Sequence, residues 1–126
     1  MQFLLMICDR EEDQPEFGSP EFMQYMQRWL ELDKEGRKKG ILLKGGGKLD
    51  TAKKARTVRK RDGKVHVTDG PYTESKELLG GYTVLECDTI EEALDYASKI
   101  PVAEWGSVEV RPFQQSLYDT KLEAEG

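Results

Sequence analysis

Histidine, cysteine and long apolar runs are scarce in this chain of 126 residues, and each scarcity excludes a class of function. The single histidine is His66, and the two cysteines, Cys8 and Cys87, form no Cys-x-x-Cys motif. Because a protein zinc site usually needs about four closely spaced Cys, His or acidic ligands, the sequence predicts no metal site and no other cofactor. Two unpaired cysteines also suit a reduced compartment.

The chain has fewer basic residues than acidic ones. Lysine and arginine number 19 against 24 aspartates and glutamates, which gives a net charge of −5. An acidic chain gives no electrostatic support for a nucleic-acid partner. No apolar run approaches the roughly 20 residues that cross a bilayer. The apolar residues 3–7 have no basic lead-in and no cleavage site, so they are not a secretory signal. We therefore expect a cytoplasmic protein without a nucleic-acid or membrane partner.

The length is enough for one domain with a hydrophobic core, which we place at residues 1–113, followed by a polar tail at 114–126. The apolar run 2–7 predicts a strand buried on both faces. Ser19 as N-cap, Pro20 at the first position and Gly40 at the end predict a helix between them. Its apolar stripe is expected to be Phe22, Met26, Trp29 and Leu30.

A short strand is predicted at residues 41–43, and Gly45-Gly46-Gly47 is expected to end it. A phosphate-binding loop needs Gly-x-x-x-x-Gly-Lys-Ser/Thr, whereas here Lys48 is followed by Leu49. The pattern therefore favours a flexible loop over a phosphate site.

The dipeptide Asp62-Gly63 lies between two strand-like runs and predicts a two-residue β-hairpin. This turn sets a register in which Val58 faces Val67 and Arg56 faces Asp69. An Arg56–Asp69 pair suits a structural salt bridge better than a general base. The basic residues between 48 and 64 are interpreted as the solvated face of this hairpin.

The second half of the chain predicts a strand, a helix and a last strand. Gly80-Gly81 begins a strand that runs to Cys87. The residues Thr89 to Glu92 form a capping box, and the helix they open is expected to bury Ile90, Leu94 and Ala97 before Pro101. Residues 107–111 alternate strictly, so the two valines Val108 and Val110 face one side, and Glu109 and Arg111 face the other.

This order of elements predicts an α+β, ferredoxin-like sandwich, in which two helices cover one face of a mostly antiparallel sheet. The uncovered face carries valine and tyrosine and is a poor solvent surface. We expect it to pack on a second copy and form a dimeric α/β barrel. The helix-free faces, with Glu109 and Arg111, would then line a cavity between the subunits.

Four segments of the chain carry a family resemblance. They are TVRKRDG at 57–63, VTDGPY at 67–72, ESKELLGGY at 74–82 and GSVEVRP at 106–112. In this order they resemble the DGPF branch of the YCII-related proteins, and the resemblance extends from Phe3 to Phe113. Tyr72 stands where this branch usually has phenylalanine.

The resemblance implies a dimeric α+β barrel and no settled reaction. Some relatives in the wider superfamily are small enzymes that act on ring compounds with a proposed His–Asp pair. Asp69 matches the aspartate, but residues 19–39, where the histidine is expected, contain none. Genes of this branch often accompany extracytoplasmic-function sigma factors, which suggests a context for the protein.

Two hypotheses of function follow. In the first, the dimer cavity binds a small polar or anionic molecule. Asp69 serves there as general acid/base, Arg59 or Arg111 holds an anionic group, and Tyr82 stacks or donates a hydrogen bond. Structural roles are the alternatives: a turn for Asp69, a salt bridge for Arg111 and interface packing for Tyr82. Glu109 is a further candidate for substrate binding, whereas His66 is expected to be an exposed hairpin residue.

In the second hypothesis the protein is a non-catalytic module that senses a ligand or regulates a partner, with a sigma factor as the suggested partner. The exposed loops at residues 9–18 and 45–54 would then meet the partner.

Overall fold

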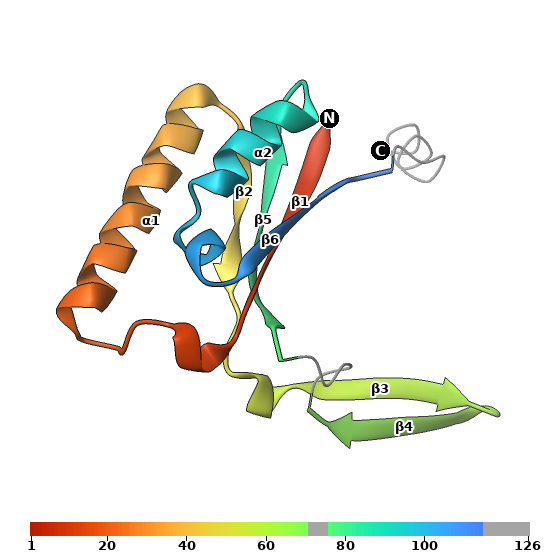
Figure 1. Cartoon of the computed structure of the whole chain (residues 1–126). Helices are drawn as coiled ribbons and strands as arrows, with labels where there is room; N and C mark the ends of the chain where they lie inside the picture. The colour runs from red at the N-terminus through yellow and green to blue at the C-terminus, as the bar shows by residue number, and fades with distance from the viewer. Residues whose placement is uncertain (71–75, 115–126) are drawn as a thin grey trace.

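A computed structural model describes residues 1–70 and 76–114 of the chain (Figure 1). The strands are β1 (Gln2–Asp9), β2 (Leu42–Lys48), β3 (Arg56–Arg61), β4 (Lys64–Asp69), β5 (Leu78–Glu86) and β6 (Ser107–Pro112). The helices are α1 (Pro20–Lys39) and α2 (Ile90–Ser98), with short 3-10 turns η1 (Glu11–Asp13), η2 (Ala52–Lys54) and η3 (Pro101–Glu104). Pro71 and Tyr72 of the predicted turn, and most of the predicted tail, lie outside the described residues.

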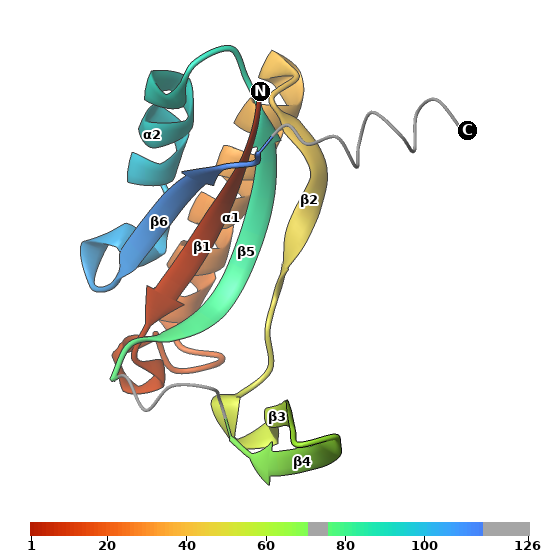
Figure 2. The same cartoon turned by 90° about the vertical axis from the view of Figure 1, so that its right-hand side faces the viewer.

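The main sheet has four strands in the order β2-β5-β1-β6, and every neighbouring pair is antiparallel. Both helices cover the same face, so that in Figure 2 the helix-free face is turned toward the viewer and α1 lies behind the sheet. This arrangement confirms the predicted ferredoxin-like α+β fold. The hairpin β3–β4 is inserted between β2 and β5 and forms a separate two-stranded sheet.

Strand β1 runs through the middle of the sheet, and its side chains alternate between the two faces. Every second residue is buried against the helices: Phe3, Leu5, Ile7 and Asp9. The residues between them on the helix-free face, such as Leu4 and Met6, are only half-buried. The prediction that β1 is buried on both faces is therefore wrong for the single chain, because the helices protect one face only.

Helix α1 has the predicted ends. The Ser19 hydroxyl accepts a hydrogen bond from the Phe22 amide, and Gly40 ends the helix in the left-handed conformation with a φ of 72°. The buried face of α1 is rotated away from the predicted stripe, as the exposed fractions of Met26 and Leu30, 39% and 53%, show. The residues that pack on the core are Tyr25, Trp29, Leu32 and Gly36. Two adjacent apolar stripes exist on this helix, and the contact with the sheet selects one of them.

Helix α2 begins as predicted, with the Thr89 hydroxyl accepting a hydrogen bond from the Glu92 amide at 3.3 Å. Its buried residues are Ala93, Tyr96 and Ala97. Of the predicted stripe only Ala97 is buried, since Ile90 and Leu94 are 39% and 50% exposed. The small alanines let this short helix lie close to the sheet, and Tyr96 fills the remaining space.

Strand β2 continues through the three glycines, so the prediction of a flexible loop there is wrong. Gly46 pairs with Thr83 and Gly47 pairs with Tyr82 of β5. A Cβ atom on Gly46 would collide with the carbonyl group of Tyr82, and one on Gly81 would lie 3.0 Å from the carbonyl oxygen of Gly47. Glycine is needed at these positions because the two backbones approach too closely for a side chain.

The hairpin β3–β4 has the predicted register at every position from Arg56–Asp69 to Arg61–Lys64. Asp62 and Gly63 have φ values of 52° and 75°, as a type I′ turn requires. We call residues 56–69 the arm. The arm extends away from the main sheet on its helix-free side, as both views show (Figures 1 and 2).

The described residues include no helix with the length and apolar character needed to cross a membrane.

Candidate functional site

A cleft of about 270 Å³ lies between α1 and the strands of the main sheet. Its apolar wall is formed by Ile7, Tyr25, Met26, Trp29, Tyr96 and Val102. The polar residues that line it are Asp9, Gln14, Asp33, Lys48, Tyr82 and Thr83. Glycines 46, 47, 80 and 81 supply backbone on the strand side. A largely apolar cleft with a few convergent polar groups is the usual form of a small-molecule site.

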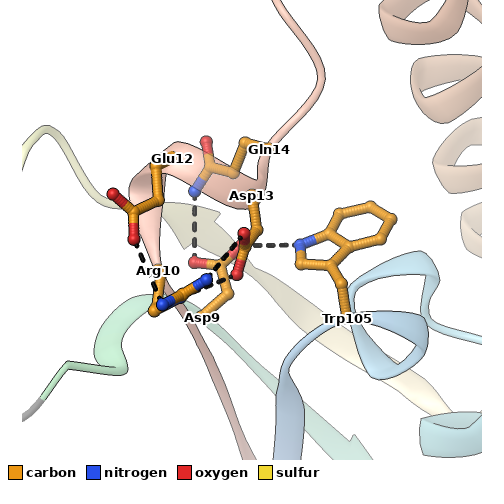
Figure 3. Close-up of polar contacts among 6 residues, drawn as sticks. All are labelled: Asp9, Arg10, Glu12, Asp13, Gln14 and Trp105. Carbon is orange, nitrogen blue, oxygen red and sulfur yellow. Dashed lines mark hydrogen bonds and ion pairs between the residues drawn. The ribbon is translucent and has the colours of Figure 1, made fainter.

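Asp9, the last residue of β1, is the buried charge of this cleft, with an exposed fraction of 3%. The Trp105 indole N–H donates to its Oδ2 at 3.1 Å, and the Gln14 amide donates to its Oδ1 at 3.2 Å (Figure 3). Within residues 1–70 and 76–114, no basic side chain lies within ion-pair distance of this carboxylate. A buried carboxylate held by neutral donors alone is incompletely compensated.

The position of Asp9 follows from the strand period and from two glycines. Asp9 is two residues after Ile7 and therefore faces the helices. A Cβ atom on Gly106 would lie 2.8 Å from the Cβ of Asp9, and one on Gly80 would lie 3.4 Å from its Oδ1. Glycine at 106 therefore lets the chain after Trp105 pass against the end of β1, which brings the indole to the carboxylate.

The segment after β1 is folded back by local ion pairs. Arg10 bonds both carboxylate oxygens of Asp13, at 3.0 and 3.2 Å, and contacts Glu12 at 3.3 Å (Figure 3). The hydrogen bond from Arg10 lowers the pKa of Asp13. This turn presents Gln14 to Asp9, and Lys48 Nζ reaches Gln14 Oε1 at 3.5 Å. A polar chain thus runs along the cleft from the indole to the exposed Lys48 ammonium.

Aromatic rings of the wall and of Trp105 contact one another beside Asp9. The Tyr25 ring lies 5.7 Å from the Trp105 ring and meets Trp29 edge-on at 6.4 Å, centroid to centroid. Burial raises the pKa of the Tyr25 phenol further above its ordinary value of 10, so the hydroxyl remains a hydrogen-bond donor. The wall can therefore hold a flat ring and offer it a hydrogen-bond donor.

A second hollow lies between α1 and α2, and both of its lysines are already paired with carboxylates. Glu35 bonds both Lys39 and Lys99 at 2.8 Å, and these hydrogen bonds lower the pKa of Glu35 to about 2. Burial raises the pKa of the adjacent Tyr96 to about 12. Because the lysines are engaged in ion pairs that join the two helices, this hollow is a weaker candidate for binding. The part of the chain that the structure describes contains no group of three His, Cys, Asp or Glu residues arranged to hold a metal.

The YCII-related domain matches residues 1–115 of this chain. The chain belongs to the YCII-related family. It is also 43% identical, over 60 residues, to an uncharacterized protein of Rhizobium meliloti (strain 1021). That match covers 46% of this chain and 48% of the relative, so it spans about half of the relative's length.

In this YCII-related chain, Asp69 lies on the arm and outside the cleft. Its side chain is 87% exposed and pairs with Arg56 at 3.2 Å, as the hairpin register predicted. Arg59 lies on the same arm, 3.4 Å from the hydroxyl of Thr68. His66 is exposed on the arm, as predicted.

The other predicted residues lie on the main sheet. Glu109 and Arg111 of β6 are 3.8 Å apart and largely exposed. They face away from the helices, because Val108 and Val110 pack on the core. Tyr82 is 42% exposed, pairs with Met6 in the register of β5 with β1, and is the predicted residue that also lines the cleft. The structure thus groups Glu109 with Arg111 on the helix-free face, and places Asp69 and Arg59 on the arm.

Asp9 and Trp105 are the site residues that the sequence reasoning missed. The acidic segment starting at Asp9 was interpreted as loop, although the alternation Phe3, Leu5, Ile7 already placed the next buried position at residue 9. No sequence signal pairs Trp105 with Asp9, since the two residues are joined only by the packing of η3 against β1.

Proposed function

We propose that this YCII-related protein binds a small, ring-bearing molecule in the cleft between α1 and the sheet, with Asp9 as its acceptor group. The observation that supports this function is the burial of the Asp9 carboxylate beside the cleft with neutral hydrogen-bond donors only. Each of its oxygens uses one acceptor site for protein and retains another for a ligand N–H or O–H.

The lining favours a ligand that has an apolar body and, at another end, an anionic or hydrogen-bond acceptor group. The rings of Tyr25 and Trp29 suit a flat apolar body. The exposed ammonium of Lys48 at the rim suits an anionic or acceptor group. A ligand that fills the cleft therefore places a hydrogen-bond donor at Asp9 and negative charge toward Lys48.

A carboxylate in this position is also suited to proton transfer. A group removed from water beside a bound ring can accept a proton from the ligand and return it, as general acid/base catalysis requires. If the protein is an enzyme, we propose this role for Asp9 and a binding role for Lys48 and Tyr25.

The binding site is tested by thermal-shift screening of the protein against a panel of small aromatic acids and amines. A ligand that binds only the folded state raises the melting temperature. We expect Asp9→Asn to abolish the shift and Lys48→Met to reduce it for anionic ligands. Asp69→Asn is the matched control, an acid-to-amide change at an exposed aspartate of the same chain. A shift that persists in Asp9→Asn and disappears in Asp69→Asn would instead support Asp69 as the functional acid.

We further propose that two copies pair through the helix-free face of the sheet, in the dimeric barrel typical of the DGPF branch. The half-buried Leu4, Met6 and Val84 and the exposed Tyr82 of this face support the proposal. Glu109 and Arg111 on the same face supply charges of both signs. A cavity between the two subunits of this dimer stays a prediction, and so does the role of Asp69 as its general acid/base.

A non-catalytic regulatory role beside an extracytoplasmic-function sigma factor is the alternative. The exposed arm supports this alternative, because a protruding hairpin offers surface that a partner can contact. A substrate screen separates the two functions. Turnover by the wild type that is lost in a folded Asp9→Asn variant would show that the protein is an enzyme. A ligand that binds and is released unchanged would favour a sensor.

A further inference from the structure

We propose that the arm packs against a second copy of this chain through the valine-bearing face of its hairpin. The inference rests on the proposed homodimer and adds to it a contact outside the helix-free face of the main sheet. Three features of the arm support it: an apolar face without cover, a base that is fixed to the body, and a charge opposite to that of the body.

The valines of the arm share one face and are uncovered. The register pairs Val58 with Val67 and Lys60 with Val65, and paired residues lie on the same face. Val58, Val65 and Val67 are 64%, 62% and 59% exposed. A two-stranded hairpin alone is marginally stable in water, so we expect a valine-rich face on such a hairpin to pack against another surface.

The base of the arm is tied to the body of the protein. The Glu11 carboxylate accepts hydrogen bonds from the Thr51 hydroxyl at 3.0 Å and from the Ala52 amide at 2.8 Å. The Gly70 amide donates to the Ala55 carbonyl at 2.8 Å, which closes the base of the hairpin. These bonds tie the segment before the arm to the body and close the hairpin, and an element ordered in this way loses less entropy on binding.

Charge and direction identify the partner as a second copy. The arm, residues 56–69, contains five lysines and arginines against two aspartates, so the arm is +3 while the whole chain is −5, which leaves −8 on the remainder. A basic arm is attracted to the acidic body of another copy. The arm also extends on the helix-free side of the sheet, where the second copy of the proposed dimer would lie (Figure 1).

The test measures dimer dissociation by sedimentation equilibrium in the full-length protein. The triple variant Val58→Thr, Val65→Thr, Val67→Thr keeps the β-branched shape that favours strands and removes apolar surface. We expect it to raise the dissociation constant about tenfold or more, with a circular dichroism spectrum like that of the wild type. His66→Thr, next to Val67 on the opposite face of the arm, is the matched control and should leave dissociation unchanged.

Val84→Lys, on the helix-free face, separates this inference from the proposed homodimer. A dimer that Val84→Lys dissociates and the triple variant does not would overturn the role of the arm and leave the homodimer standing. A wild type that is monomeric at tens of micromolar would overturn both. If the triple variant does not fold, hydrogen exchange of the wild type decides the question: arm amides that exchange equally fast in the dimer and in the diluted monomer contradict the inference.

Discussion

At the scale of single residues, the site depends on how a buried carboxylate is compensated. Asp9 was predictable as a buried position from the period of β1, yet its partners were not. Gln14 is five residues away in the chain and Trp105 is 96 away. Local chemistry places a side chain on a face, whereas only the packed fold brings a distant donor to it.

We predict that Trp105→Phe destabilises the protein by roughly 1–3 kcal/mol, because it leaves one oxygen of a buried carboxylate without its donor. Urea unfolding measures the loss. In the Asp9→Asn background the same change should have a smaller effect, since an amide is less expensive to leave unpaired than a charge. Effects that add within about 0.3 kcal/mol would show that Trp105 acts through packing alone.

A second residue-scale prediction concerns Glu35, whose pKa is lowered to about 2 by hydrogen bonds from Lys39 and Lys99. A carboxylate with a lowered pKa stabilises the folded state above its ordinary value of 4.5 and loses this contribution as the pH falls toward 2. The melting temperature of the wild type should therefore exceed that of Glu35→Gln near neutral pH and approach it at pH 2.

Because Glu35 lies at the surface, the difference should be small and should shrink in high salt. A difference that stays constant from pH 7 to pH 2 would contradict this account of the ion pairs.

At the scale of elements, the sequence predicted ends and turns better than faces. The N-caps Ser19 and Thr89 and the turn at Asp62-Gly63 are decided by neighbouring residues, and all three are confirmed. The buried stripes of α1 and α2 were only partly right, with Trp29 packed against the core and Ala97 within it as predicted, because each helix has two adjacent apolar stripes and the sheet selects between them. The glycines of β2 were also misinterpreted, since their role depends on how close β5 lies.

Two of those glycines allow a matched comparison. A Cβ atom at Gly46 meets the backbone of Tyr82, whereas one at Gly47 lies 3.8 Å from Cε1 of the Tyr82 ring, an ordinary contact. We predict that Gly46→Ala destabilises the protein by about 1–3 kcal/mol because β2 and β5 must separate. Gly47→Ala should be near neutral. Equal effects in thermal unfolding would contradict the close approach of the two strands.

At the scale of the whole molecule, the order of elements was sufficient for the fold, because few topologies join these strands and helices. The cleft was not predictable, since its walls come from α1, α2, β1 and the segment after it, β2, β5 and η3. The sequence reasoning looked for the site between two subunits, while the cleft that the structure describes lies within one.

The helix-free face still carries a pattern that a twofold dimer can use. In a twofold interface, when one residue contacts a second across the axis, the second also contacts the first. Glu109 and Arg111 lie two residues apart on this face, so an antiparallel pairing of two β6 strands can place each glutamate against the partner's arginine. We predict that Glu109→Arg raises the dissociation constant of the dimer about tenfold, since it brings like charges together.

The double variant Glu109→Arg, Arg111→Glu should restore dimerisation, because it exchanges the two signs and keeps the pairing. Light scattering across a dilution series measures both variants, and added salt should narrow the difference between them. Restoration distinguishes pairing across the axis from a general effect of net charge, because the double variant has the net charge of the wild type. A double variant as weak as Glu109→Arg would mean that these charges do not meet across the interface, and the helix-free face would then have to associate through Leu4, Met6 and Tyr82 alone.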